Sequence, residues 1–209
     1  MPAPAKHTAI AQQRDGRPPR QRVDPADYAQ AYRERSVEIL AGISVEAVTE
    51  LIEILAAALK DGRQVFICGN GGSAATASHF AAGLGKDGSA GRDKKFRVLS
   101  LTDNLPWITS LANDHDYSQI FVEQLKNFGQ SGDVLIAFSG SGNSGNILRA
   151  IEWAHANGLL TVGITGRTGG RLGQLVRHAI FVDSTHMGHI EEAHFLLQHL
   201  VSYYFEEAE

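Results

Sequence analysis

Residues 138–146, FSGSGNSGN, form the most informative segment of the chain. An apolar run at 133–137 (DVLIA) precedes this segment, and a helical pattern at 147–154 (ILRAIEWA) follows it. A buried strand is therefore expected to lead through a loop of glycines and hydroxyls directly into the N-terminus of a helix. Such a terminus has unpaired backbone N–H groups and a partial positive charge of roughly half an electron.

This loop is predicted to bind a phosphate group. Its glycines let the backbone approach a ligand closely, and Ser139, Ser141 and Ser144 add hydroxyl donors. Backbone N–H groups and a helix N-terminus together make a site for anions such as phosphate. An ordinary strand-to-helix turn also uses Gly and Ser for its geometry. The density of hydroxyl and amide side chains favours the phosphate site.

Composition limits the classes of protein that need to be considered. Of the 209 residues, 43% are hydrophobic and 20% are charged, as in ordinary globular proteins. The net charge of −4 gives no basic footprint for nucleic acid. The single cysteine, Cys68, excludes an intramolecular disulfide and a multi-cysteine zinc site. No apolar run is long enough to span a membrane, and no signal-peptide core is visible, so we expect a cytoplasmic protein.

The N-terminal 24 residues differ from the rest of the chain. They are rich in Pro, Gln and Arg and have no periodicity, which predicts a disordered or loosely draped arm. Residues 25–209 are expected to form a single domain with two leading helices, which begin near Pro25 and Ser44. Because these helices precede the first strand, we expect them to pack outside the sheet or against another subunit.

Strands and helices then alternate along the chain. Apolar runs at 65–68, 97–101, 134–137, 161–164 and 179–182 are predicted strands. Helices are predicted to begin near residues 73, 117, 146 and 171, with a last helix over 188–207. Apolar strands separated by helices are typical of a parallel sheet that is covered on both faces. The fold predicted is an α/β, flavodoxin-like, doubly wound five-stranded parallel sheet, with ligands bound beyond the carboxyl ends of its strands.

The first predicted strand also ends in a polar, glycine-rich loop, residues 68–76 (CGNGGSAAT). Gly69, Gly71 and Ala74 match a relaxed dinucleotide fingerprint, but the first acidic residue after the second strand, Asp103, is too distant for such a site. No Gly-Lys-Ser/Thr sequence follows either loop, which excludes a Walker-type nucleotide site. Two neighbouring loops with Asn and Ser suit a phosphorylated polyol better than a dinucleotide.

The two loops, in this order and with their following helices, resemble the sugar isomerase (SIS) domain, and within it the phosphoheptose isomerase family. Further matches lie at His79-Phe80-Ala81, Asp103, Ala112-Asn113-Asp114, Thr165-Gly166, Gly169-Gly170, Ile190-Glu191-Glu192, His194 and His199. The resemblance covers roughly residues 30 to 207. It implies a homotetramer with active sites at subunit contacts, and phosphosugar-binding residues at Asn70, Gly71, Gly72, Ser73, Asp103, Asn104, Ser139, Gly140, Ser141 and Ser144.

The resemblance implies the conversion of sedoheptulose 7-phosphate to D-glycero-D-manno-heptose 7-phosphate through an enediol, with a glutamate base, a histidine acid and often a zinc ion. The family's histidines fall on His79 and His199, but its glutamate falls on Gly83 and its C-terminal glutamine on Glu191. His79, Glu191 and His199 are therefore the candidate zinc ligands, and Glu191 with His199 the candidate catalytic pair. The alternative is that Glu191 is a solvated helix residue and that the histidines are interface groups.

Two functions remain open at this point. The first is an isomerase acting on a phosphorylated seven-carbon sugar. The second is a non-catalytic SIS protein that binds a phosphosugar or another protein, as the initiator-associating members of the superfamily do. Loss of the family glutamate at Gly83 favours the second function, whereas His199 favours the first.

Overall fold

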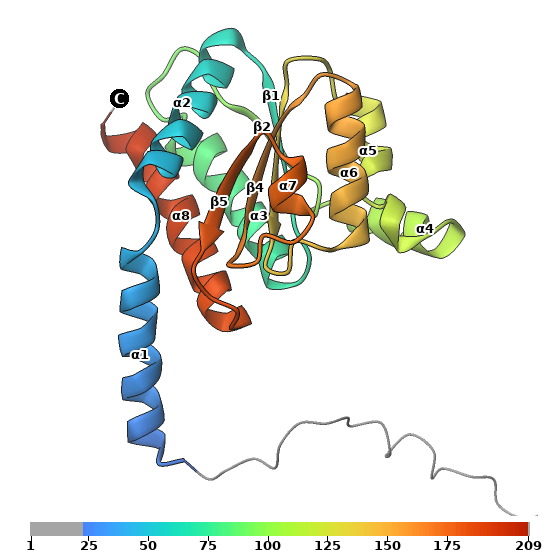
Figure 1. Ribbon diagram of the computed structural model, residues 1–209. Coiled ribbons are helices and arrows are strands. Elements are labelled where there is room, and N and C mark those ends of the chain that lie inside the picture. The colour runs from blue at the N-terminus through green and yellow to red at the C-terminus, as the bar shows by residue number, and fades with distance from the viewer. Residues whose placement is uncertain (1–22, 209) are drawn as a thin grey trace, which may run out of the picture. The chain divides into compact units, whose positions relative to one another are not determined.

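The computed structural model describes residues 23–208 of the chain (Figure 1). The N-terminal arm predicted for residues 1–24 therefore lies almost wholly outside the described residues. The chain divides into two compact units, Met1–Glu34 and Arg35–Glu209, with the boundary inside helix α1 (Pro25–Ala41). In the described part of the first unit, the rings of Tyr28 and Tyr32 stack with centroids 6.0 Å apart.

A five-stranded parallel sheet forms the centre of the second unit. Its strand order is β2-β1-β3-β4-β5, which is the flavodoxin-like order predicted from the sequence. The strands are β1 (Gln64–Cys68), β2 (Arg97–Ser100), β3 (Val134–Ser139), β4 (Leu160–Gly166) and β5 (His178–Val182). Strand β1 pairs with β2 on one side and with β3 on the other. After β1 the chain continues to β2 on one side of the sheet, whereas β3 to β5 follow on the other side. Folds of this type bind ligands where the strand order reverses in this way, which here is at the carboxyl ends of β1 and β3.

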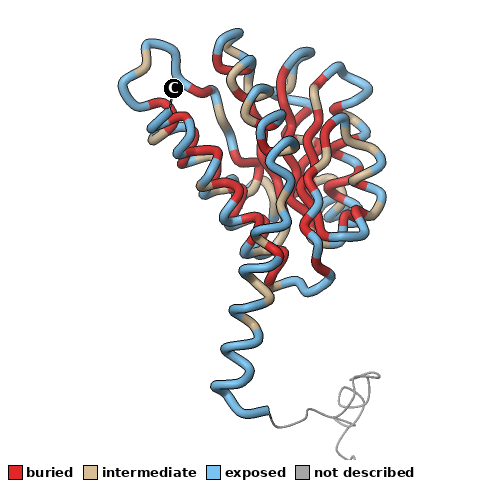
Figure 2. Tube along the Cα trace, turned by 60° about the vertical axis from the view of Figure 1, so that its left-hand side comes forward, coloured by how far each residue is buried: buried red, intermediate tan, exposed pale blue. Residues whose placement is uncertain are grey.

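Helices cover both faces of the sheet, and the apolar strand residues pack against them (Figures 1 and 2). Val65 and Ile67 point to one core, and Phe66 and Cys68 point to the other. The first core lies under α2 (Val45–Asp61), α3 (Gly72–Ala82) and α8 (Met187–Glu207). The second core lies under α4 (Leu105–Asp114), α5 (Val122–Phe128), α6 (Gly145–Ala156) and α7 (Leu172–Leu175). Burial on both faces explains why the strands lack polar alternation.

Helix α2 forms where the sequence predicts it. The Ser44 hydroxyl caps its first turn by accepting a hydrogen bond from the Ala47 N–H at 3.1 Å, and Gly62 ends it with a left-handed φ of 67°. Leu51 and Leu55 are fully buried in the first core. The apolar stripe of α2 therefore packs on the sheet of its own chain and not against another subunit, which was one of the two places expected for the leading helices.

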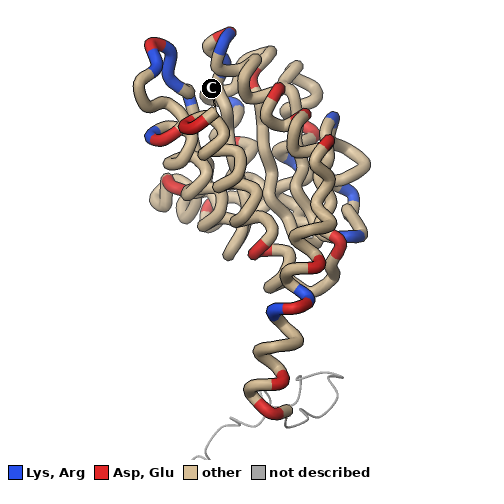
Figure 3. Tube along the Cα trace, turned by 90° about the vertical axis from the view of Figure 1, so that its left-hand side faces the viewer, with Lys and Arg blue, Asp and Glu red and all other residues tan. Residues whose placement is uncertain are grey.

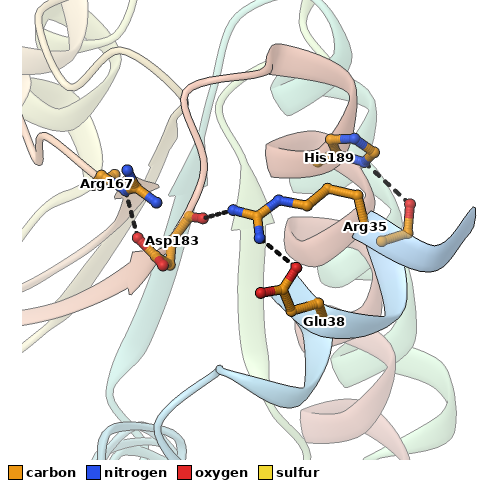
Figure 4. Close-up of polar contacts among 6 residues, drawn as sticks. Arg35, Glu38, Arg167, Asp183 and His189 are labelled. Atoms are coloured by element: carbon orange, nitrogen blue, oxygen red, sulfur yellow. Dashed lines mark hydrogen bonds and ion pairs between the residues drawn. The ribbon is translucent and has the colours of Figure 1, made fainter. Parts of the chain in front are cut away.

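The second half of α1 is attached by polar contacts to α8 and to the loop that precedes it (Figure 4). The Ser36 hydroxyl lies 3.0 Å from Nδ1 of His189, and the Arg35 guanidinium donates to the backbone carbonyl of Asp183 at 3.4 Å. Beneath these contacts, Ile39 is buried against Val182 and other apolar residues. These contacts fix residues 35–41 within the second unit.

Three features were not predicted from the sequence. Helix α4 occupies a region to which no helix was assigned, and the helix predicted from residue 117 is a short 3₁₀ turn (Tyr117–Gln119) followed by α5. Helix α3 continues into one turn of π-helix, Gly83–Asp87. None of the described helices is both long and apolar enough to cross a membrane.

Helix α8 buries a row of polar side chains one turn apart, at His194, Gln198 and Ser202. Each is at most 2% exposed, and none of these side chains has a hydrogen-bond partner among the residues that the structure describes. Burial lowers the pKa of His194 from 6.5 to about 4, because the charged imidazolium would lose its hydration. The neutral ring instead packs beside Phe138, with ring centroids 5.3 Å apart.

We expect His194 to make folding stability dependent on pH. The unfolded chain takes up a proton near pH 6.5 but the folded chain does not, so stability is complete above about pH 6.5 and falls as the pH drops towards about 4. Between about pH 7.5 and about pH 4.5, His194 should lower the free energy of unfolding by about 2 to 3 kcal/mol. Urea unfolding of the wild type and of His194→Leu at both pH values measures this change. The exposed His115, changed in the same way, is the control, and equal pH dependence in wild type and His194→Leu would contradict the prediction.

Candidate functional site

A cleft with a volume of about 290 Å³ lies at the carboxyl ends of β1 and β3. It brings together the two polar loops that the sequence analysis singled out. Its lining comprises Asn70, Gly71, Gly72, Ser73, Phe138, Ser139, Gly140, Ser141, Ser144, Met187 and Glu191. Eight of the ten predicted phosphosugar-binding residues and the candidate base Glu191 therefore share one cleft.

The loop between β3 and α6 is folded by its own polar groups. The backbone N–H of Gly142 donates to the Ser139 carbonyl at 3.0 Å, and that of Asn143 donates to the Ser141 hydroxyl at 3.2 Å. Gly142 has a φ of +64°, and a methyl group there would lie 2.0 Å from the Gly169 carbonyl oxygen. Only glycine fits this position, so the tight course of the loop requires it.

This loop delivers the start of α6 to the cleft. Ser144 is the N-cap residue, but its own side chain does not cap the helix; instead Asn146 Oδ1 accepts a hydrogen bond from the Ile147 N–H at 3.0 Å. The N–H groups of Gly145 and Asn146, at the first two positions of α6, are therefore available to an anion, together with the Ser144 hydroxyl. Helix α3 begins at the same edge, after Gly71, and receives no side-chain cap from the described residues. Two helix N-termini thus open onto one cleft.

An amide pair ties the two loops together. Asn70 Nδ2 donates to Asn146 Oδ1 at 3.0 Å, and Asn146 Nδ2 donates back to Asn70 Oδ1 at 2.8 Å. The Tyr117 hydroxyl also donates to Asn70 Oδ1, at 3.0 Å. We call this arrangement the Asn70–Asn146 clasp. Asn70 lines the cleft as predicted, but its amide serves to hold the loops in place. Sequence reasoning missed Asn146 and Tyr117, because the contact links residues far apart in the chain.

Glu191 approaches the cleft from α8. A methyl group on Gly72 would lie 2.6 Å from its carboxyl carbon, so the carboxylate rests directly against the first turn of α3. Side chains on a helix lean towards its N-terminus, which directs Glu191 to the cleft end of α8. Negative charge is favoured near a helix N-terminus. The cleft therefore offers hydrogen-bond donors suited to a phosphate on one side and a carboxylate on the other.

Asp103 and Asn104, which were also predicted to bind the phosphosugar, do not line this cleft. The Asn104 side chain caps α4 by accepting a hydrogen bond from the Trp107 N–H at 3.1 Å. The Asp103 carboxylate accepts a hydrogen bond from the Ser78 hydroxyl on α3. Both side chains thus have a structural partner within the chain. Asn104 followed closely by Pro106 is a helix-start signal that could have predicted α4.

The candidate zinc ligands are brought together only in part. The rings of His79 and His199 lie 4.8 Å apart, and the Phe195 ring lies 4.9 Å from His79 and 4.8 Å from His199. Glu191 lies eight residues before His199 on α8, roughly 12 Å along the helix axis, and points to Gly72. Across residues 23–208 no three His, Cys, Asp or Glu side chains are grouped so as to hold a metal ion. The residues of one chain therefore do not fit a zinc site.

Comparisons with known proteins agree with the fold. A model of the SIS domain family matches residues 27–166. The phosphoheptose isomerase of Rhodospirillum rubrum is 39% identical over 171 residues, which are 80% of this chain and 88% of that protein. This chain belongs to the phosphoheptose isomerase family of SIS domain proteins.

Other members of the phosphoheptose isomerase family give the same result. The Aquifex aeolicus phosphoheptose isomerase is 37% identical over 182 residues, covering 84% of this chain and 93% of that protein. The structure of a phosphoheptose isomerase from Francisella tularensis superposes with a TM-score of 0.82 at 29% identity. That match covers 88% of this chain and all of the other. The predicted membership of this family and the predicted fold are confirmed.

We expect the Asn70–Asn146 clasp to be required for anion binding. Asn146→Ala leaves Asn70 Nδ2 without its acceptor, while the Tyr117 hydroxyl still donates to Asn70 Oδ1. The loss should cost about 1 to 3 kcal/mol of stability and weaken the binding of inorganic phosphate. Urea unfolding and calorimetric phosphate titration measure the two effects. Asn127→Ala is the matched control, because the amide of the exposed Asn127 donates to the Glu123 carbonyl on α5 at 2.9 Å, away from the cleft. Equal effects of the two variants would show that the clasp does not organise the loops.

Proposed function

We propose that this protein is a cytoplasmic phosphosugar isomerase that interconverts sedoheptulose 7-phosphate and D-glycero-D-manno-heptose 7-phosphate. The observation that carries the proposal is the cleft itself, in which the β3–α6 phosphate loop and the Glu191 carboxylate line the same 290 Å³ hollow. Membership of the phosphoheptose isomerase family supports the seven-carbon substrate.

In this proposal the phosphate binds to the loop and Glu191 acts on carbon. The substrate phosphate accepts hydrogen bonds from Ser139, Ser141 and Ser144 and from the N-terminus of α6. Glu191 removes a proton from C1 of the ketose, the electron pair forms the C1–C2 double bond, and an acid protonates the carbonyl oxygen at C2. Return of a proton to C2 and loss of the proton on O1 give the aldose. The N-terminus of α3 lies beside Glu191, and its partial positive charge favours the negative charge of the carboxylate and of the oxygens of the reacting sugar.

His199 is the proposed acid, although it does not line the cleft of its own chain. It stands two helical turns from Glu191, half-buried beside the exposed His79. His199 would therefore serve a site formed with a second copy of the chain. This assignment depends on self-association.

We propose that the chain self-associates, as a homotetramer, through an apolar stripe on α8. The stripe consists of Phe195, Leu196, Leu200, Tyr203 and Tyr204, which are between 37% and 47% exposed. No Lys, Arg, Asp or Glu interrupts α8 from 193 to 205, so this stretch of the trace carries neither blue nor red in Figure 3. A helix with a continuous exposed apolar face is typical of a protein contact.

Light scattering on the full chain tests the self-association. The wild type is expected to be a tetramer at micromolar concentration, and Leu200→Asp to be smaller, because a buried, unpaired carboxylate is costly. Leu105→Asp is the control, since Leu105 is 66% exposed on α4, on the other face of the sheet. A monomeric wild type, or an unchanged mass for Leu200→Asp, would contradict the proposed contact.

The reaction is tested by incubating the protein with sedoheptulose 7-phosphate and following aldose formation by NMR. We expect Glu191→Gln to lower the rate at least about a hundredfold with substrate binding retained, since removal of a general base typically costs 10²–10⁴-fold. Glu192→Gln is the matched control, because the neighbouring Glu192 bonds to Ser36 and lies outside the cleft lining. Full activity of Glu191→Gln would exclude Glu191 as the base.

A second candidate function is a non-catalytic phosphosugar-binding protein. It is favoured by Gly83, which leaves α3 without the carboxylate that the family resemblance implies at this position. Phosphosugar binding without turnover by the wild-type oligomer would establish this function in place of the isomerase.

A further inference from the structure

Helices α3 and α8 run side by side, and their residues meet in a fixed register. At the cleft end, Gly72 of α3 lies against Glu191 of α8. Two turns further on, the ring of His79 lies 4.8 Å from that of His199. Beyond them, where α3 continues into its π-turn, Gly83 lies against Ser202. We call this line of contacts the α3–α8 seam.

The register separates Glu191 from the two histidines. Gly72 and His79 are seven residues apart on α3, which corresponds to roughly 10 Å along the helix axis. Glu191 lies at the Gly72 end of the seam and leans further towards the N-terminus of α8. Its carboxylate is therefore directed into the cleft and away from the imidazoles.

Position 83 cannot supply a replacement ligand. It lies four residues after His79, where helical spacing places a side chain on the same face. A Cβ atom on Gly83 would lie 2.5 Å from Ser202 Oγ and 3.0 Å from Ser202 Cβ. Both residues are buried, so Ser202 fills the space that a side chain at position 83 would need. The seam is closed at this point.

The third ring beside the two histidines is a phenyl ring. Phe195 lies within 4.9 Å of both imidazoles, measured between ring centroids. A protein zinc site takes at least three nitrogen, oxygen or sulfur ligands in tetrahedral geometry. The His79–His199 pair supplies two, and the described part of the chain contains no third group placed to join them.

From the closed Gly83–Ser202 contact and the displaced Glu191, we infer that this protein holds no zinc ion at the His79–His199 pair. In the proposed reaction, proton transfer at carbon then depends on Glu191 without a metal in the seam. The role of Glu191 without a metal rests on the proposed function, whereas the absence of zinc is tested directly by the metal content of the protein.

The full-length oligomer, purified from zinc-supplemented cells and dialysed, should contain far less than one zinc per chain by mass spectrometry. Calorimetric titration with zinc chloride should show no site of one ion per chain, because a two-histidine site binds zinc weakly. Stoichiometric zinc in the purified wild type, retained through dialysis, would overturn the inference. Both measurements use the wild type alone and do not depend on a variant folding.

A pair of variants tests the cause. Gly83→Glu combined with Ser202→Gly opens the seam and adds a carboxylate one turn from His79, and we expect it to gain close to one zinc per chain. Gly83→Ala combined with Ser202→Gly opens the seam without a carboxylate and should gain none. Gly83→Glu alone should lower the melting temperature, because its side chain collides with Ser202. A folded Gly83→Glu/Ser202→Gly protein without zinc would show that closure of the seam is not what excludes the metal.

The same preparations separate this inference from the proposed function. Turnover of sedoheptulose 7-phosphate by zinc-free wild type supports both. Turnover that requires added zinc, with one zinc bound per chain, leaves the isomerase and overturns the inference. Absence of both turnover and zinc leaves the inference and removes the isomerase.

Discussion

The N-termini of α3 and α6 open onto the same edge of the sheet, and the rest of the site depends on this arrangement. Neighbouring strands β1 and β3 each end in a loop that leads directly into a helix, so two sets of unpaired N–H groups face one cleft. Two partial positive charges this close together attract anions. The cleft satisfies them with two kinds of negative group, a carboxylate from α8 and, in the proposed function, the phosphate of the substrate.

That arrangement requires the two loops to keep a constant separation. The Asn70–Asn146 clasp provides this, because each amide both donates to and accepts from the other. Asn146 is buried, so an alternative partner from solvent is excluded. The clasp thus adds a side-chain link between the ends of two strands that pair with each other, β1 and β3. A rigid pair of loops is what a binding site for a small, charged group needs.

The features that the sequence predicted correctly are those encoded locally. Apolar runs, the Ser44 cap and the two glycine-rich loops each depend on residues within one turn or strand, and the structure places them as expected. Asn104 caps α4, a role that the sequence analysis did not assign to it. Helical periodicity allows Glu191 and His199 to share one broad face of α8, but the axial distance between them decides what they can bind in common. The clasp and the Gly83–Ser202 contact depend on tertiary packing, which periodicity does not report.

Helix α8 shows how one element divides several functions among its faces. Its first turns direct Glu191 into the cleft, its inner face carries the buried row from His194 to Ser202, and its outer face is apolar and exposed. The buried row is polar although it packs against α3 and its π-turn. Ser202 of that row can approach α3 closely only because position 83 is glycine. An isoleucine or leucine at 202 would pack against the core better but would leave no room for the π-turn of α3. Close approach of the two helices therefore requires glycine at position 83. The acidic group that lines the cleft comes from α8, at the end of the seam nearest the β3–α6 loop.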